Sequence, residues 1–439
     1  MTEAEFSHDG PGTPVRTWDV ALAERSLAIL ELPPTPGLLV VLGAHPDDES
    51  LGVAGLINTL SRRGWQIVVI SATAGEGSHP SSPTLTREEL ADRRRDELDR
   101  AIEAVAPAAD VTCLGLPDGE VAEHEDELVK HLVAVVGDRG AETVLCAPWR
   151  KDGHPDHEAA GRAAAITARR TDARLLEYPV WLWHWGSAPD LPCQMARAWH
   201  LDDEARTAKR SAIAAHASQV LPISDKPGDE VLLVPQMLAH FTRGSEVVVE
   251  DPRPVSDDAL DEVHRSRPDP WQVDSWYERR KRALTQASLP REHYSRALEI
   301  GCSIGALAED LAARCDQLLA VDSSPAAVAA AGTRLAALPH VEVRLTVMPD
   351  GWPEGLFDLV SVSEVGYFLS PRELDELIRR AFDSLAPGGH IVLCHWRHQP
   401  VGWPLDGPVV HDAFRARAAT ELVALEEPDF LLHVLGGPS

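Results

Sequence analysis

The stretch that decides the fold of the first half is GLLVVLGAHPDDES, residues 37–50. It begins with a short apolar run, 37–44, which is typical of a strand buried on both faces of a parallel sheet. Pro46 follows this run, and proline is favoured in the first turn of a helix, so we predict a helix over 47–62. Gly64 comes just after that helix, where a C′ glycine is expected. The stretch therefore indicates a strand, a tight turn and a helix.

The same alternation continues outward along the first half. The runs that predict further strands are 65–73, 111–116, 143–148 and the aromatic run LLEYPVWLWHW at 175–185, and helical patterns cover 86–106 and 123–137. Strands that alternate with helices indicate a parallel sheet with helices on both faces.

After a polar stretch the alternation starts again. Residues 251–270 are rich in proline and acidic residues, which predicts a linker with one short helix. The strands predicted beyond it are 296–301, 317–322, 341–347, 357–365, 390–396 and 430–435, with helices at 276–289, 304–314 and 324–338. We therefore expect an α/β protein with two doubly wound, mostly parallel-sheet (Rossmann-like) domains, at 1–250 and 271–439, joined by the polar linker.

Composition limits the partners and the compartment. The 439 residues are 44% hydrophobic, which is enough for two separate cores. The 69 acidic residues outnumber the 41 Lys and Arg and give a net charge of −28, which repels phosphate backbones and anionic lipids. We therefore expect neither nucleic acid nor a membrane as the main partner. The acidic N-terminus lacks the apolar core of a secretory signal and no two cysteines have CxxC spacing, so we expect a cytoplasmic protein with reduced thiols.

Polar side chains follow two of the predicted strands in the first half. His45, Asp47 and Asp48 come after the first strand, and His154 and His157 come after the strand at 143–148. Both turns are expected at the carboxyl edge of the sheet, where ligands bind. Two imidazoles and a carboxylate suit a catalytic divalent metal, zinc in particular, although iron or manganese accept the same donors. The remaining carboxylate and His have the chemistry of a general base and an oxyanion stabiliser or acid. Any one of these residues taken alone is more often a helix cap.

AHPDDE (44–49) together with HPDH (154–157) resembles the PIG-L (LmbE-like) family of zinc-dependent N-deacetylases over roughly residues 37–250. Arg94, Glu97, LGLPDG (114–119) and Asp152 are further matches. The resemblance implies that His45, Asp48 and His157 ligate zinc. It also implies that Asp47 is the general base and that His154 polarises the tetrahedral intermediate or acts as an acid. The substrates it implies are small molecules or glycoconjugates with an N-acetylated amino sugar.

Other polar and aromatic residues of this half have two interpretations each. Arg94 and Glu97 either belong to the site or form a surface pair on a helix. Trp181, Trp183, His184 and Trp185 either pack in the core or form a pocket wall against a sugar face. Glu76 and His79 lie in a loop at the same edge of the sheet and either reach the substrate or have no part in the site.

A glycine turn marks the start of the second domain. Gly301 and Gly305 lie between a predicted strand and a helix, and Asp322 ends the next strand. Glycines there let the backbone approach a ligand, and the acidic residue can accept hydrogen bonds from a ribose diol. Residues 301–305 also fit the G-x-S-x-G nucleophile elbow of hydrolases, but too few strands precede them for that fold.

The whole pattern resembles a class I S-adenosylmethionine-dependent methyltransferase over about 265–439. The carrying segments are LEIGCSIG (298–305), AVD (320–322), FDLVSVSEV (357–365) and APGG (386–389), and DPWQVDSWYERRK (269–281), SEVGYFL (363–369) and HWR (395–397) are similar to the NodS-like branch. The resemblance implies that Glu299, Gly301, Cys302, Gly305 and Asp322 bind S-adenosylmethionine, and the branch N-methylates a free glucosamine nitrogen. Tyr277, Arg280 and Glu364 either face the substrate or lie on an ordinary surface.

Two such domains on one chain indicate consecutive reactions, because deacetylation frees an amine and an amine is a methyl acceptor. We therefore expect a metal-dependent N-deacetylase that is also a methyltransferase. One alternative is methylation of a hydroxyl of the same product. The other is a C-terminal domain that binds S-adenosylmethionine only to regulate or scaffold.

Overall fold

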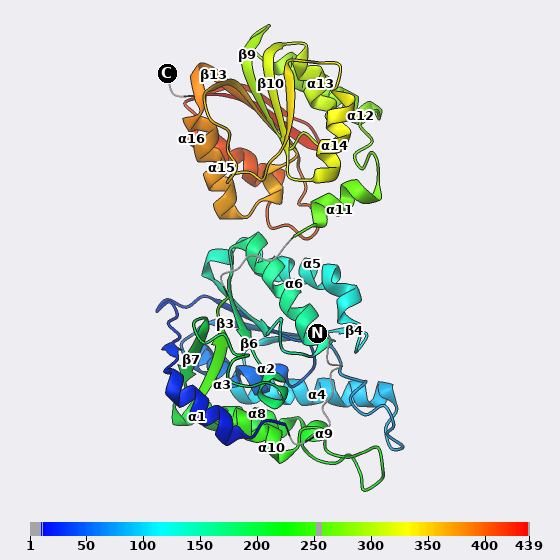
Figure 1. Ribbon diagram of the computed structural model, residues 1–439, viewed down its shortest axis with the longest axis vertical. Helices are drawn as coiled ribbons and strands as arrows, with labels where there is room; N and C mark the ends of the chain where they lie inside the picture. Colours follow the sequence, from blue (N-terminus) through cyan, green and yellow to red (C-terminus); the bar gives the residue numbers. More distant parts are fainter. Residues whose placement is uncertain (1–9, 11, 252–256, 438–439) are drawn as a thin grey trace. The chain divides into compact units, whose positions relative to one another are not determined.

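The computed structural model divides the chain into two compact units, Met1–Val255 and Ser256–Ser439, each a sheet flanked by helices (Figure 1). It describes residues 10, 12–251 and 257–437. Within these residues, no helix combines the length and the apolar character that crossing a membrane requires. The two sheets are mixed and mostly parallel, so the predicted fold class is confirmed.

The first unit is built on an eight-stranded sheet in the order β1-β7-β8-β6-β5-β2-β3-β4. Its strands are β1 Ala28–Ile29, β2 Leu38–Gly43, β3 Gln66–Thr73, β4 Asp110–Leu116, β5 Thr143–Pro148, β6 Arg174–Tyr178, β7 Ala196–His200 and β8 Ser245–Val249. All neighbours pair in parallel except that β8 is antiparallel to β6 and β7. Strand β2, which the opening stretch predicts, lies between β5 and β3 and is buried along its whole length.

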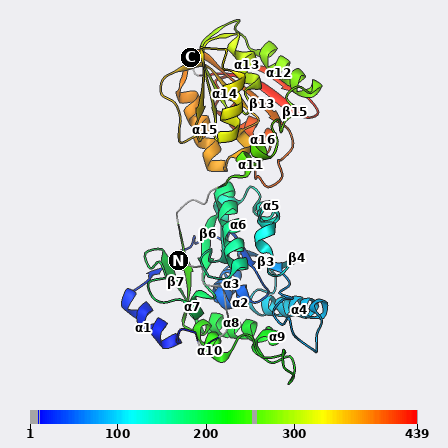
Figure 2. The ribbon, with the colours of Figure 1, turned by 45° about the vertical axis from the view of Figure 1, so that its right-hand side comes forward.

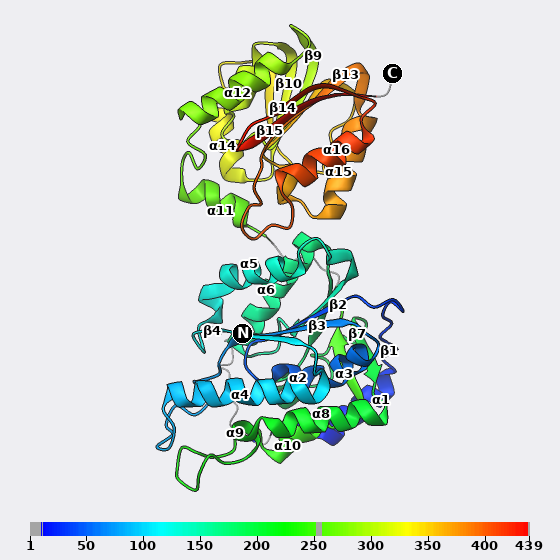
Figure 3. The same cartoon turned by 180° about the vertical axis from the view of Figure 1, so that it is seen from behind.

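Helices cover both faces of this sheet (Figure 3). They are α1 Val15–Arg25, α2 Asp48–Gly52, α3 Ala54–Arg62, α4 Arg87–Val105, α5 Glu125–Val136, α6 Pro155–Thr171, α7 Leu182–Trp185, α8 Asp203–Ala215, α9 Ala217–Val220 and α10 Pro235–Leu238, with 3-10 turns η1 Val121–His124, η2 Gly140–Glu142 and η3 Ala239–Phe241. Successive side chains of a strand point to opposite faces. Accordingly Leu39 and Val41 join the core with α3 and α4, and Leu38 and Val40 join the core with α5 and α6.

Two local predictions in the first unit are wrong. The helix expected over 47–62 is split into α2 and α3 at Val53, and it begins at Asp48, so Pro46 precedes it. The strand expected over 175–185 ends at Tyr178. Pro179 has no N–H for a strand ladder, and the next backbone N–H groups, from Val180 to Leu182, donate to the Asp152 carboxylate instead.

The second unit is also a sheet flanked by helices (Figure 2). Its seven strands follow the order β11-β10-β9-β12-β13-β15-β14. Its strands are β9 Tyr294–Ile300, β10 Cys315–Asp322, β11 Val341–Leu345, β12 Phe357–Ser363, β13 Leu385–Trp396, β14 Thr420–Glu426 and β15 Phe430–Gly436. The pairs from β11 to β13 are parallel, and β15 is antiparallel to both β13 and β14.

The helices of this unit again form two layers. They are α11 Ala259–Ser266, α12 Trp276–Ser288, α13 Ala306–Ala312, α14 Pro325–Arg334, α15 Pro371–Asp383 and α16 Gly407–Arg417, with the 3-10 turn η4 Gly366–Phe368. Leu307 of α13 and Ala331 of α14 lie in one core cluster, and Leu377 of α15 and Phe414 of α16 lie in the other. The short helix expected within 251–270 is α11, and it contacts α14 through a 2.6 Å hydrogen bond from Ser324 Oγ to Asp261.

Candidate metal centre and cofactor site

His157 lies in the first turn of α6 and is held between two carboxylates. Its Nδ1 lies 2.8 Å from Oδ2 of Asp152, and its Nε2 lies 3.2 Å from Oδ1 of Asp48. The Nε2 atom is buried and has no hydrogen-bond partner among the described residues. Burial disfavours charge on this ring, but the Asp48 and Asp152 carboxylates outweigh it and raise the pKa of His157 to about 9. The surroundings of Nε2 therefore favour positive charge.

His45 follows β2 and contacts its supporting carboxylates through Nε2, whereas His157 contacts Asp152 through Nδ1. Its Nε2 lies 3.1 Å from Asp118 and 3.2 Å from Asp156, while its Nδ1 lies 3.7 Å from Oδ2 of Asp48. Asp156 is fixed in turn, because it accepts the backbone N–H groups of Gly119 and Val121. The ring is therefore oriented with Nδ1 toward Asp48.

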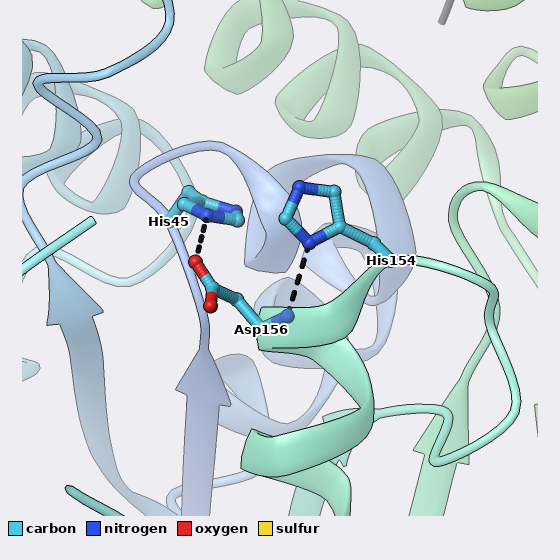
Figure 4. A group of neighbouring side chains, drawn as sticks. All are labelled: His45, His154 and Asp156. Atoms are coloured by element: carbon cyan, nitrogen blue, oxygen red, sulfur yellow. Dashed lines mark hydrogen bonds and ion pairs between the residues drawn. The ribbon is translucent and has the colours of Figure 1, made fainter. Parts of the chain in front are cut away.

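His45, Asp48 and His157 each offer one ligand atom, and these atoms lie within 4.8 Å of one another. The outer nitrogen of each His contacts a carboxylate, which is the usual arrangement around a metal-bound imidazole. Nε2 of His157 makes no hydrogen bond among the described residues and lies beside the Asp48 carboxylate, so this donor set fits a divalent cation. His45, His154 and Asp156 form a second group of the same size, but there Nδ1 of His154 already accepts the N–H of Asp156 (Figure 4). The first group is thus the better candidate.

Asp47 lies beside this group and has an unusual backbone. Its φ is 143°, a value that residues other than glycine rarely adopt. Its carboxylate lies 3.1 Å from Nη2 of Arg94. Burial raises the pKa of Asp47 to about 6, although the Arg94 guanidinium opposes the shift. Arg94 also donates to the carbonyl oxygens of Pro46 and Gly75. These bonds hold the guanidinium beside the Asp47 carboxylate. The result is a buried carboxylate of raised basicity next to the metal-ligand group.

The surface-pair interpretation of Arg94 and Glu97 is wrong. Arg94 is 2% exposed and Glu97 is 1% exposed. Glu97 accepts hydrogen bonds from the backbone N–H and the hydroxyl of Ser218, at the start of α9. Both residues therefore connect α4 to the interior of the unit.

His154 is the N-cap of α6, and its Nδ1 accepts the N–H of Asp156 at 3.2 Å. Burial lowers the pKa of His154 to about 2, with a further decrease from His157 and His45. The ring is therefore neutral near pH 7, with its hydrogen on Nε2, and acts as a donor rather than a cationic acid. It stacks on Trp181 at a centroid distance of 6.5 Å and an angle of 23°.

The aromatic residues after β6 have different surroundings. Trp183 packs edge-on against Trp18 in the core, at 4.9 Å between ring centroids. Trp181 contacts the ring of His154, and Trp185 is half exposed and donates to the backbone oxygen of Asp152. Core packing thus describes both Trp183 and Trp181, and Trp181 also borders the site through its contact with His154.

The supporting carboxylates had no role in the sequence analysis. Asp118 occurs there only within LGLPDG and Asp156 only inside HPDH, and Asp152 is a match to which no role is given. The LPDG turn was the available signal for Asp118, whose backbone N–H donates to Glu76 and whose carboxylate accepts the N–H of Gly77. His79 has its Nε2 2.9 Å from the backbone oxygen of Glu230. The contact from Glu76 therefore helps to fix Asp118 in place.

The glycine turn of the second unit is built as the motif requires. Gly301 has a φ of 74°, and a Cβ there would lie 1.9 Å from Cγ2 of Val365. Gly305 has a φ of 81°. Asp322, at the end of β10, accepts the N–H of Ser303 at 2.8 Å and that of Ser324 at 2.9 Å. A side chain at Gly301 would clash, both glycines have the left-handed backbone that glycine favours, and Asp322 holds the loop between them.

Two buried polar atoms at this turn lack partners among the described residues. They are Oε2 of Glu299 and Oγ of Ser303. Burial, with help from Asp322, raises the pKa of Glu299 to about 8. A bound molecule with hydrogen-bond donors and a diol would satisfy these groups, so the site fits S-adenosylmethionine. Cys302 instead has its side chain in the core and donates its N–H to the backbone oxygen of Val321.

Comparisons with known proteins agree with this division. Residues 40–168 match the family model of PIG-L, GlcNAc-PI de-N-acetylase, and residues 256–400 match that of Nodulation protein S (NodS). The chain therefore joins an N-terminal PIG-L deacetylase domain to a C-terminal NodS-like methyltransferase domain. Both resemblances seen in the sequence are confirmed.

Individual relatives cover one domain each. Nodulation protein S of Rhizobium tropici is 35% identical over 127 residues, which are 28% of this chain and 53% of that protein. The 1D-myo-inositol 2-acetamido-2-deoxy-alpha-D-glucopyranoside deacetylase of Kineococcus radiotolerans is 29% identical over an alignment of 176 residues, and the match covers 32% of this chain and 48% of that protein. The chain thus spans about half the length of these curated relatives.

One solved structure is the N-methyltransferase NodS from Bradyrhizobium japonicum WM9 in complex with S-adenosyl-L-homocysteine. It is 30% identical, and the match covers 41% of this chain and 97% of that one, with a TM-score of 0.38.

Proposed function

We propose that the protein catalyses two consecutive reactions on one substrate. The first is metal-dependent removal of an acetyl group from an N-acetylated amino sugar, and the second is methylation of the freed amine with S-adenosylmethionine. The observation that carries the proposal is the donor group of His45, Asp48 and His157 beside the basic carboxylate of Asp47, on a chain that continues into a NodS-like domain. The name of the Kineococcus relative supports a 2-acetamido sugar as the substrate class.

His45, Asp48 and His157 are the residues that would hold the metal. A bound zinc ion, or another divalent metal, would supply Lewis acidity and lower the pKa of water. Asp118 and Asp156 orient His45, and Asp152 orients His157, so the protein fixes both rings before any ligand arrives.

Asp47 and His154 supply the acid–base chemistry. Asp47 takes the proton of the attacking water, which its raised pKa favours, and Arg94 keeps its carboxylate in place. His154 donates its Nε2–H to the oxyanion of the tetrahedral intermediate, because its Nδ1 is occupied as an acceptor. The neutral ring thus stabilises the negative charge of the oxyanion through a hydrogen bond.

In the second unit the glycine turn and Asp322 would bind the cofactor. Gly301 and Gly305 let the backbone approach it, and Asp322 and Glu299 offer carboxylate oxygens to its hydroxyl and amino groups. S-adenosylmethionine supplies the methyl group. The amine that the first reaction frees is a better nucleophile than the amide from which it came.

Mass spectrometry of reactions with a panel of N-acetylated amino sugars tests the proposal. With the full chain we expect loss of an acetyl group without S-adenosylmethionine, and loss of acetyl followed by gain of one methyl group with it. Deacetylation without any methyl transfer, but with binding of labelled S-adenosylmethionine, would instead support a regulatory C-terminal domain. Methyl transfer to the unhydrolysed substrate would support a hydroxyl acceptor.

A further inference from the structure

Glu364 follows β12 directly and lies next to the glycine turn. Its neighbour Val365 is the residue that a side chain at Gly301 would strike. Glu364 has a φ of 57°, in the left-handed region, so its side chain leaves the strand end in a direction that regular strand geometry does not give. A carboxylate is thus placed at the same edge of the sheet as the cofactor site.

The carboxylate of Glu364 is held by three donors. Oε1 lies 2.7 Å from Nζ of Lys281, and Oε2 accepts the hydroxyl of Tyr367 and, at 3.0 Å, the backbone N–H of Trp396. Burial would raise the pKa of Glu364, but the Lys281 ammonium and these hydrogen bonds outweigh it and lower the pKa. A carboxylate has about four lone-pair positions, so one remains on Oε1.

The side chain that carries this position is only partly buried. The Glu364 side chain is 28% exposed, whereas that of Lys281 is only 7% exposed. Tyr277, on the same helix as Lys281, has a buried hydroxyl without a hydrogen-bond partner among the described residues. The ammonium of Lys281 lies 5.2 Å from the centre of the Tyr277 ring, which places that ring beside the ion pair. A partly exposed carboxylate and a tyrosine whose buried hydroxyl lacks a partner among the described residues therefore lie beside the same Lys281 ammonium.

We infer that Glu364 binds the amino group of the methyl acceptor, with Tyr277 as a second polar contact. This inference rests on the proposed function and names the group that selects an amine over a hydroxyl. An ammonium or amine donates to the open position on Oε1, and a charged donor makes the stronger hydrogen bond. A sugar hydroxyl at the same place gains much less from the negative charge.

Binding to the full chain saturated with S-adenosylhomocysteine tests this role. The probes are glucosamine and glucose, which differ at one position, and neither carries an acetyl group for the first domain to remove. For the unmodified protein we expect glucosamine to bind at least about tenfold more tightly, the size of one charged hydrogen bond. For Glu364→Gln we expect the two sugars to bind within about twofold of each other.

Glu427→Gln is the matched control. Glu427 also pairs with helix α12, through Arg280 at 2.7 Å, and is 25% exposed, so its removal deletes a similar ion pair without touching Glu364. This variant should retain the preference for glucosamine. Calorimetric binding of S-adenosylhomocysteine, unchanged in both variants, shows that the site is folded. A second variant, Glu364→Asp, keeps the charge. Its preference for glucosamine should lie between that of the unmodified protein and that of Glu364→Gln.

A tenfold preference retained in Glu364→Gln would overturn the inference and leave the proposed function intact. An equal loss of S-adenosylhomocysteine binding in that variant would also overturn it, because Glu364 would then serve the cofactor. If the unmodified protein transfers methyl to a hydroxyl and binds both sugars alike, the proposed function fails and the inference fails with it.

Discussion

Nδ1 of His157 lies 2.8 Å from Oδ2 of Asp152, and this contact decides which nitrogen of the ring faces Asp48. Asp152 is buried and is itself fixed by three backbone N–H groups at 180–182. The orientation of the metal-ligand group thus depends on a carboxylate outside it.

Asp152→Asn should weaken zinc binding by about 10–100-fold, the usual cost of losing such a supporting contact. The amide is neutral, and its NH₂ group cannot accept the backbone N–H groups that the carboxylate accepts. Competition titration with a metal chelator measures the affinity. Asp138→Asn, at an exposed position, is the control and should bind zinc normally. Equal affinity in both variants would contradict the role of Asp152.

Asp47→Asn should keep the metal and lose about 10²–10⁴ in deacetylation rate, as expected for a general base. The matched variant His157→Ala should lose both metal and activity, because it removes a ligand. Elemental analysis of the two purified proteins, beside their rates, separates the roles. An Asp47→Asn protein that hydrolyses at the normal rate would show that another group takes the proton.

Asp322→Ala should lower the affinity for S-adenosylmethionine by about 1.5–3 kcal/mol, the range for hydrogen bonds to a charged group. The variant also releases the N–H groups of Ser303 and Ser324, which loosens the glycine turn. Calorimetry measures the change, and deacetylation should be unaffected. Asp316→Ala, on the same strand but exposed, should bind the cofactor as the unmodified protein does. Similar losses in both variants would point to general destabilisation of β10.

Three buried histidines make the second unit sensitive to acid. The N–H of Gly366 donates to Nε2 of His395, whose Nδ1 lies 3.0 Å from His411, and His411 contacts His433. Because the backbone N–H can only donate, the contacts fit three neutral rings. Burial lowers the pKa of all three, that of His395 to about 4.

Below about pH 6.5, each of these three histidines therefore binds protons more readily in the unfolded chain than in the folded one. The contribution of the three neutral rings to the free energy of unfolding is complete above that pH. It decreases as the pH falls toward 4, by up to about 1.4 kcal/mol per pH unit for each histidine. In calorimetry of the full chain, S-adenosylhomocysteine should raise the melting temperature of one transition, which identifies the second unit. That melting temperature should fall between pH 7 and pH 5. A constant or rising value would contradict the assignment.

The sequence was sufficient where neighbouring strands bring their ends together. AHPDDE and HPDH follow β2 and β5, which are adjacent and parallel, so His45, Asp48 and His157 meet. It was insufficient where the contact comes from a distant loop or helix. Asp118 reaches His45 from the turn after β4, and Arg94 reaches Asp47 from α4, and neither contact has a periodic signal.

In other places, tertiary packing determined the structure and the local sequence pattern did not. The helix expected over 47–62 breaks where Gly52 packs closely against the ring of Tyr178, and the hydroxyl of that tyrosine donates to Leu42. Strands β1, β7 and β8, which form one edge of the first sheet, are not predicted by the sequence. Strand β8 carries Glu246, whose carboxylate accepts the N–H groups of Gly55 and Leu56 at the start of α3. Such an antiparallel insertion is not implied by alternating strands and helices.

The order of the two reactions is the central claim, and methyl transfer by the Asp47→Asn protein tests it most directly. This variant should bind S-adenosylmethionine normally but should free the amine about 10²–10⁴-fold more slowly. Given the acetylated amino sugar, it should transfer methyl no faster than it frees the amine. Given the free amine, it should transfer methyl at the rate of the unmodified protein. Full-rate transfer to the still-acetylated sugar would contradict sequential N-methylation.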